Sequence, residues 1–208
     1  MNFERRRLDN ANEAHEARDD LSVGSDQNQP KRLANKPGFK KNEFVVYPGH
    51  GVGQITAIEV QTVAGFRLEF FVVYFSKSKL RARVPTQKAA GIGLRKLSSP
   101  AAIEQVRRTV SQAASKARTN WARLTKEYEA KIKSGEILAL AEVIRDLHPR
   151  STQPEHSYSE RQLYLTALNR LSAEVAIVED IAEEKAALEL ESLLISRTGR
   201  AAVRLTKG

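Results

Sequence analysis

The only tryptophan of the chain sits inside its most basic stretch. Trp121 lies close to Arg118, Arg123 and Lys126, and residues 104–133 hold eight Lys or Arg against three Asp or Glu. An indole ring can stack on bases or insert between them, while guanidinium and ammonium groups bind phosphates. The segment therefore combines two side-chain types that a nucleic-acid contact uses.

The same residues also fit a structural role. Leu124, Tyr128 and Ile132 follow Trp121 at helical steps of three and four residues, which favours burial of the ring in a helical core. However, Trp121 falls in the first turn of the predicted helix, where a ring can project from the helix end. The residue pattern alone leaves both interpretations open.

A second pair of cations lies on a predicted strand. In KLRARVP, apolar residues alternate with Arg81 and Arg83, which is typical of a half-buried strand with two arginines facing water, and Pro85 ends the strand. Charge on an exposed edge strand prevents unwanted strand pairing. The same edge can instead accept a partner strand whose acidic groups meet the arginines. Both interpretations remain open.

The sequence contains no recognisable catalytic, metal or cofactor motif. There is no cysteine, and the four histidines are scattered. The glycine-rich PGHGVG lacks the GK[ST] ending of a phosphate-binding loop and leads into another strand, so a tight β connection is expected. No Ser, His and acid set comes with a recognisable elbow. We therefore expect a protein that is not an enzyme and needs no cofactor or metal.

Charge is unevenly distributed along the chain. Residues 38–97 carry ten Lys or Arg and three Asp or Glu, and residues 98–150 carry ten and six. Residues 151–196 reverse the balance, with three basic and nine acidic residues. Such a sided distribution favours binding of a polyanion, with nucleic acid the leading candidate. The first residues lack the apolar region of a secretion signal, and no membrane-spanning run occurs, so we expect a cytoplasmic protein.

Hydrophobic periodicity divides the chain into four parts. Residues 1–37 are poor in large apolar residues and are expected to be a disordered extension. Residues 38–97 hold short β-branched and aromatic runs separated by turn residues, which predicts a small antiparallel β domain. Residues 98–196 change to helical spacing and predict a compact all-α domain of about five helices. Residues 197–208 are expected to form a basic flexible tail.

Capping signals place the ends of these helices. Ser99 and Pro100 begin the first, which is expected to run to about residue 115. Thr119 or Asn120 caps the second, and Gly135 stops it. The third covers about 137–147 and ends at His148 and Pro149. Overlapping capping boxes, of which Ser157 with Glu160 is one, open the fourth, and Asp180 with Glu183 opens a fifth that runs through residue 194.

Two stretches together resemble one known family. FKKNEFVVYPGHGVGQITAIE with RVPTQKAAGIGLRKL is similar to the polymerase-interaction domain of the CarD/CdnL family of bacterial transcription regulators, a Tudor-like β domain. TNWARLTKEYEAKIKSGEILALAEVIRDL followed by YSERQLYLTALNRL is similar to the helical C-terminal domain of that family. The resemblance covers about residues 38–195, with both domains in order.

The resemblance implies a regulator that docks its Tudor/SH3-like β domain on the RNA polymerase β subunit. The polymerase-contact strand corresponds to the run that holds Arg83 and Pro85, beside Arg81, with Val63 on the neighbouring hairpin. Gln61 stands where relatives often carry arginine.

For the helical domain, the resemblance implies contact with promoter DNA. The family's tryptophan enters the minor groove at the upstream edge of the melted bubble and slows collapse of the open complex, a role that corresponds to Trp121. Arg123 and Lys126 occupy positions where relatives carry DNA-contacting cations, and Arg118 partly replaces an arginine that is Leu124 here.

Two other functions fit the same charge pattern. A basic nucleoid protein acting without polymerase would bind duplex DNA tightly and with steep salt dependence. A scaffold whose basic face meets acidic proteins would leave no DNA footprint. Under each of these functions we expect a monomer.

Overall fold

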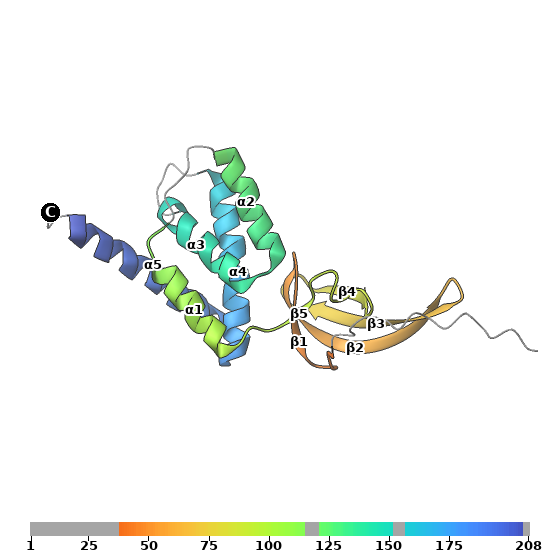
Figure 1. The fold of residues 1–208 in the computed structure, drawn as a ribbon. Coiled ribbons are helices and arrows are strands. Elements are labelled where there is room, and N and C mark those ends of the chain that lie inside the picture. The colour runs from red at the N-terminus through yellow and green to blue at the C-terminus, as the bar shows by residue number, and fades with distance from the viewer. Residues whose placement is uncertain (1–37, 115–120, 152–156, 206–208) are drawn as a thin grey trace, which may run out of the picture. The chain divides into compact units, whose positions relative to one another are not determined.

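The computed structural model of the protein describes residues 38–114, 121–151 and 157–205. The predicted extension 1–37, Arg118 and the two candidate caps Thr119 and Asn120 lie outside these residues. The described part begins with a β domain and continues with helices, which confirms the predicted fold class (Figure 1).

The β domain is one antiparallel sheet in which the strands lie in the order β4-β3-β2-β1-β5. Its strands are β1 (Phe44–Tyr47), β2 (Gly51–Val63), β3 (Phe66–Phe75), β4 (Leu80–Pro85) and β5 (Arg95–Lys96). The short turn between Tyr47 and Gly51 confirms that PGHGVG is a tight β connection. Gly49 and Gly51 both take positive φ there, a conformation that costs glycine little.

One face of the sheet is buried. Alternate residues of a strand point to opposite faces, and Phe71, Val73 and Phe75 of β3 all point into the core. This β core is completed by residues of the other strands and of the connecting segments: Phe39, Val45, Ile55, Val84, Ala89 and Leu94. The predicted small antiparallel β domain thus has its core on the side of β3 that carries Phe71, Val73 and Phe75.

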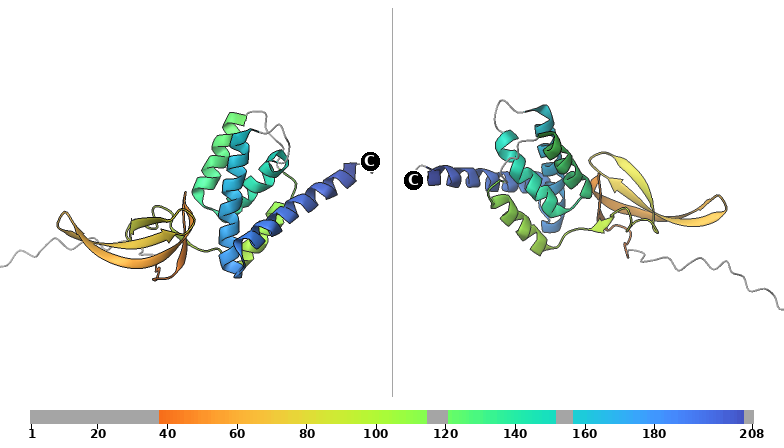
Figure 2. Two further views of the ribbon diagram at one scale, coloured as in Figure 1. Left: turned by 180° about the vertical axis from the view of Figure 1, so that it is seen from behind. Right: turned by 45° about the horizontal axis from the view of Figure 1, so that its top comes forward.

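Five helices form the second domain within the residues that the structure describes. They are α1 (Pro100–Ser111), α2 (Trp121–Ser134), α3 (Ile137–Ser151), α4 (Tyr158–Glu179) and α5 (Glu183–Leu205). α4 packs against α3, α2 and α5, and the views in Figures 1 and 2 agree on this arrangement. The predicted apolar stripes, including Val106, Ile144 and Leu171, meet in one helical core that is separate from the β core.

The first two helices behave largely as predicted. Ser99 caps α1 by accepting a hydrogen bond from the Ala102 backbone N–H at 3.3 Å, with Pro100 in the first turn. Gly135 takes a φ of +71° directly after α2, as expected for a helix stop. α1 ends at Ser111 instead of continuing to about residue 115.

Several other predicted helix ends were wrong. α3 continues through Pro149 to Ser151, because packing of the buried Leu147 and His148 outweighs the backbone donor that the proline removes. Ser157 precedes α4, but its side chain makes no capping bond, so the box with Glu160 does not form.

The end of α4 and the course of α5 also differ from the prediction. Asp180 ends α4 in the left-handed conformation, with φ +54°, and does not open α5. α5 continues through Leu205, where the sequence suggested a flexible tail after residue 196. Alanine, arginine and leucine are strong helix formers and are frequent in this added stretch.

Candidate functional site

The helix α2 carries the predicted nucleic-acid residues. Tyr128 and Ile132 are buried and hold one side of the helix against the helical core. Leu124 is half-buried and packs on the same core. The apolar side predicted from the spacing is therefore confirmed.

Trp121 is the first residue of α2. Its ring is half-buried and packs against the helical core, so it is neither sealed inside nor fully exposed. Its carbonyl accepts a hydrogen bond from the Thr125 hydroxyl at 3.0 Å. The first turn of a helix leaves backbone N–H groups without helical acceptors, and these groups favour a nearby phosphate. The indole is thus partly packed and partly exposed, at an end of the helix that suits anions.

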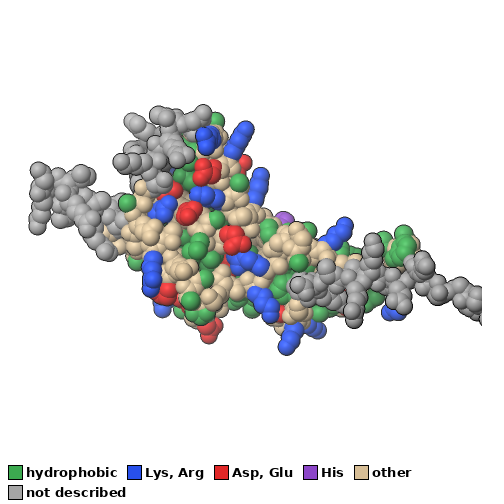
Figure 3. All heavy atoms as spheres, viewed as in Figure 1, with side chains coloured by type: hydrophobic (Ala, Val, Ile, Leu, Met, Phe, Trp, Pro, Cys, Tyr) green, Lys and Arg blue, Asp and Glu red, His purple; other side chains and the backbone are tan. Residues whose placement is uncertain are grey.

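The other side of α2 is basic. Arg123, Lys126 and Lys133 are exposed, and their spacing of three and seven residues places them in one row, here called the basic stripe. Lys126 and Lys133 make no ion pair within the described part of the chain. Figure 3 shows Lys and Arg side chains projecting along this side of the helical domain.

Lys131 differs from the basic stripe because it is neutralised by neighbours. Its Nζ lies 2.8 Å from a Glu142 carboxylate oxygen and 3.5 Å from one of Glu127. Burial disfavours its charged form, but the two carboxylates outweigh that effect and raise the pKa of Lys131 above its ordinary value. The sequence count of basic residues therefore overstates the charge that α2 offers to a ligand.

The predicted polymerase residues lie together on the β domain. In the described part of the sheet β4 is an edge strand that pairs only with β3, as its arginines suggested. Pairing aligns Arg81 with Tyr74, Arg83 with Val72, and Pro85 with Phe70. These side chains share the face of the sheet opposite to the β core.

Val63 extends this face to the tip of the β2–β3 hairpin. It pairs with Phe66, and the two side chains are 47% and 71% exposed. We call the following set the open face: Val63, Phe66, Phe70, Arg81, Arg83 and Pro85. The structure thus brings all four predicted residues of this site onto one surface and adds two phenylalanines that the sequence analysis did not select.

The two arginines of the open face have close neighbours. The Arg81 guanidinium carbon lies 5.8 Å from the centre of the Tyr74 ring, within reach of a cation–π interaction. The Arg83 Nε lies 3.5 Å from a Glu59 carboxylate oxygen. Gln61, the departure from the family pattern, donates to the same Glu59 oxygen at 3.3 Å. An exposed ion pair contributes little stability, so Arg83 can exchange Glu59 for an acidic partner at small cost.

The two sites differ in what they suit. The open face combines exposed apolar side chains, arginines and an unpaired strand edge, which together suit a protein partner. The first turn of α2 and the basic stripe suit a phosphate backbone with accessible bases. Within the described residues, no group of three or more His, Asp or Glu is placed to hold a metal, and no helix is long and apolar enough to cross a membrane.

Comparisons with known proteins match the β domain and the helical domain separately. Residues 39–98 match the model of the CarD-like/TRCF RID domain, and residues 105–191 match that of the CarD C-terminal domain. The Bacillus subtilis (strain 168) protein named "Putative transcription factor YdeB" is 28% identical over 147 residues, which cover 71% of this chain and 96% of that protein. With a Tudor-like β domain and a helical domain in this order, the chain belongs to the CarD/CdnL family of transcription regulators.

Proposed function

We propose that the protein binds the β subunit of RNA polymerase through its open face and stabilises the promoter open complex through its helical domain. The DNA contact is made in the minor groove at the upstream edge of the melted bubble. The observation that carries the proposal is the half-buried Trp121 in the first turn of α2, on a helix whose other side bears the basic stripe.

The polymerase contact follows from the edge position of β4. Its outward backbone groups are available to pair with a strand of the partner. Arg81 and Arg83 then meet acidic groups beside that strand, and the apolar hairpin tip adds buried area. Family membership supports this partner, because the matched domain is the CarD-like/TRCF RID domain.

The DNA contact is favoured at a fork junction. Inserting a ring into an intact duplex costs a few kcal/mol for unstacking, and an already frayed junction avoids most of that cost. Trp121 therefore binds the melted state better than the closed one, and only such differential binding shifts an equilibrium. One aromatic stack contributes about 1–2 kcal/mol, enough to change the open-complex lifetime by about tenfold.

Weak intrinsic affinity for DNA suffices in this mechanism. Once the open face is bound to polymerase, the helical domain meets promoter DNA at a raised local concentration. Arg123 and Lys126 add phosphate contacts that depend on salt. The protein supplies no chemical step in this mechanism and acts only by binding.

The decisive experiment measures open-complex lifetime on one promoter with and without the protein, after a competitor traps released polymerase. We expect a longer lifetime with the protein, and no such effect from an Arg83→Glu variant that cannot dock. If both proteins leave the lifetime unchanged and each binds duplex DNA tightly alone, the protein is a polymerase-independent DNA-binding protein and the proposal is wrong.

A further inference from the structure

One arginine of the sheet is bonded to α4 and to the residue that directly follows α2. Arg95, in β5, donates to both carboxylate oxygens of Glu174 in α4, at 2.7 and 2.9 Å. The same guanidinium donates to the carbonyl of Gly135, directly after α2, at 2.5 Å. Arg95 thus links the sheet to the helix that carries the proposed DNA site.

Glu174 is almost fully enclosed, with 1% of its surface exposed. Besides Arg95, it accepts hydrogen bonds from the backbone N–H and the hydroxyl of Ser98, at 2.9 and 2.7 Å. Ser98 belongs to the connection between the two domains. A buried carboxylate with a bidentate arginine and two further donors holds its partners in one geometry.

A second arginine repeats this arrangement from the helical side. Arg170 in α4 donates to the Ile132 carbonyl at 2.8 Å and also to the Gly49 carbonyl in the β1–β2 turn. The last carbonyls of a helix lack intrahelical partners and carry partial negative charge, so cations bind them well. Both arginines therefore connect the C-terminal end of α2 to the β domain.

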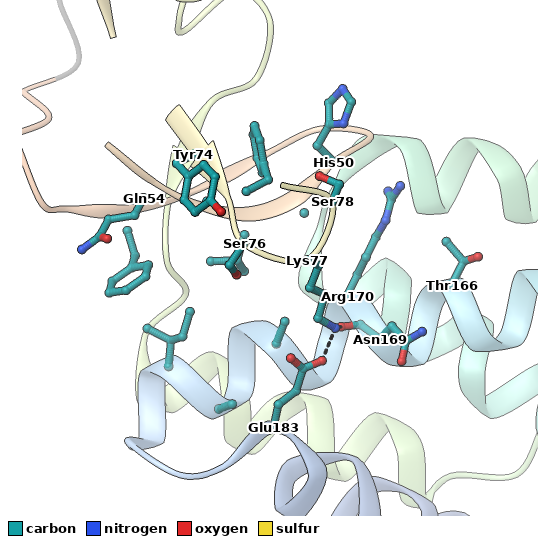
Figure 4. A pocket seen from close by; sticks show the side chains of 18 of the residues that line it. His50, Gln54, Tyr74, Ser76, Lys77, Ser78, Thr166, Asn169, Arg170 and Glu183 are labelled. Carbon is teal, nitrogen blue, oxygen red and sulfur yellow. Dashed lines mark hydrogen bonds and ion pairs between the residues drawn. The ribbon is translucent and has the colours of Figure 1, made fainter. Parts of the chain in front are cut away.

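Apolar packing does not replace these contacts. The helical core and the β core are separate clusters. Between α4 and the sheet lies a pocket of about 670 Å³, lined in part by Tyr74, Phe75 and Ile177. Lys77 bridges it by contacts to Glu183 and, at 3.2 Å, to the Asn169 carbonyl (Figure 4). Besides Arg95 and Arg170, Lys77 thus adds a polar contact between the sheet side and the helices.

We propose that Arg95, Glu174 and Arg170 are positioning residues that fix α2 relative to the open face, so that DNA and polymerase are bound at the same time. This inference rests on the proposed function. We call the contacts that these three residues make between the two domains the joint. A fixed joint raises the effective concentration of the second contact, and a loose joint lowers it without changing either binding surface.

The variant Glu174→Gln tests the joint because it keeps the shape of the side chain and removes its charge. Glu179→Gln is the matched control. It lies on the same helix and removes a carboxylate bonded twice to Arg107, at 2.7 Å each, but this pair joins helices only. Both variants therefore weaken a bidentate arginine–carboxylate pair, fully buried at Glu174 and partly buried at Glu179, but only the Glu174 pair contacts the sheet.

A distance measurement reads the joint directly. The chain has no cysteine, so Thr62→Cys and Ala130→Cys, both at exposed positions, give one spin label on the hairpin and one on α2. We expect a single narrow distance distribution in the parent and in Glu179→Gln, and a broader one in Glu174→Gln. A narrow distribution in a folded Glu174→Gln protein overturns the inference. If that variant does not fold, Arg95→Lys, which keeps the charge but loses the bidentate fork, replaces it under the same criterion.

The functional readout separates positioning from general destabilisation. In the full chain, we expect Glu174→Gln to bind polymerase alone and duplex DNA alone as the parent does, yet to lose most of the lengthening of open-complex lifetime. If Glu174→Gln lengthens the open-complex lifetime as much as the parent does, the inference that a fixed joint couples the two contacts is overturned. If the parent itself does not lengthen the lifetime, the proposed function fails, and the distance distribution still decides whether these residues fix the joint.

Discussion

Trp121 and Lys126 lie on nearly opposite sides of α2, one packed against the helical core and the other exposed. Five residues at about 100° each separate them by about 140° around the helix axis. A nucleic acid that touches both has to pass around the first turn of α2. The ring and the basic stripe therefore make separable contributions to binding, which single substitutions can distinguish.

Replacing Trp121 with alanine should remove the contact with unstacked bases. We expect the lengthening of open-complex lifetime to fall by about tenfold, the equivalent of about 1.4 kcal/mol, with polymerase binding unchanged. Lifetimes measured after addition of a competitor, together with a polymerase pull-down, check both parts.

Because the ring is half-buried, Trp121→Ala also loses packing, and Leu124→Ala provides the control. Leu124 is half-buried against the same core on the same helix. Thermal unfolding is expected to report a modest loss of stability in both variants. If Trp121→Ala and Leu124→Ala shorten the lifetime equally, lost packing explains the effect and the proposed contact of Trp121 with bases is wrong.

Reversing the charge of Arg83 should abolish polymerase recruitment. A glutamate at this position on β4 meets Glu59, and it repels the acidic partner that the arginine suits. Arg67→Glu is the control, since Arg67 is exposed on β3 but alternation places it on the other face of the sheet. Co-purification with polymerase should fail only for Arg83→Glu. If this variant still co-purifies with polymerase, the open face is not the docking site.

Single lysines of α2 should differ in their effect on salt dependence. Each cation that neutralises a phosphate adds about 0.9 to the slope of log K against log salt. Lys126→Ala and Lys133→Ala are each expected to lower that slope by about this amount. Lys131→Ala should change it less, because Glu127 and Glu142 already neutralise this lysine. Titrations with forked DNA at several salt concentrations measure the slopes. Equal slopes in the three variants would mean that the basic stripe does not contact phosphates.

Strand and helix periodicity predicted most of the fold, because burial of one face enforces it. The alternation around Arg81 and Arg83 located an edge strand, and the spacing after Trp121 located the core side of α2. Phe66 and Phe70 were missed although alternation along FRLEFFVVYF places them together. Lys133 was missed as well, although it lies seven residues beyond Lys126 in the same row.

The joint between the domains could not be predicted in the same way. Arg95 and Glu174 are 79 residues apart, and each is unremarkable in its local sequence. Glu174 even falls within an acidic stretch that reads as a solvated helix face, yet it is 1% exposed. Whether such a carboxylate is buried or exposed depends on its tertiary partners, and no local sequence pattern shows which residues these are.

Packing around Gly53 gives a prediction for the β domain alone. A Cβ at this position would lie 2.7 Å from Val73 Cγ1 and 2.8 Å from Phe75 Cε1, both fully or almost fully buried. Gly53→Ala should therefore cost about 1–3 kcal/mol in free energy of unfolding. Gly91→Ala is the control, since its Cβ would approach nothing closer than the Lys88 carbonyl at 3.6 Å. Hydrogen exchange of the β2 and β3 amides should accelerate only in the first variant; equal protection in both would mean that the sheet relaxes around the added methyl group.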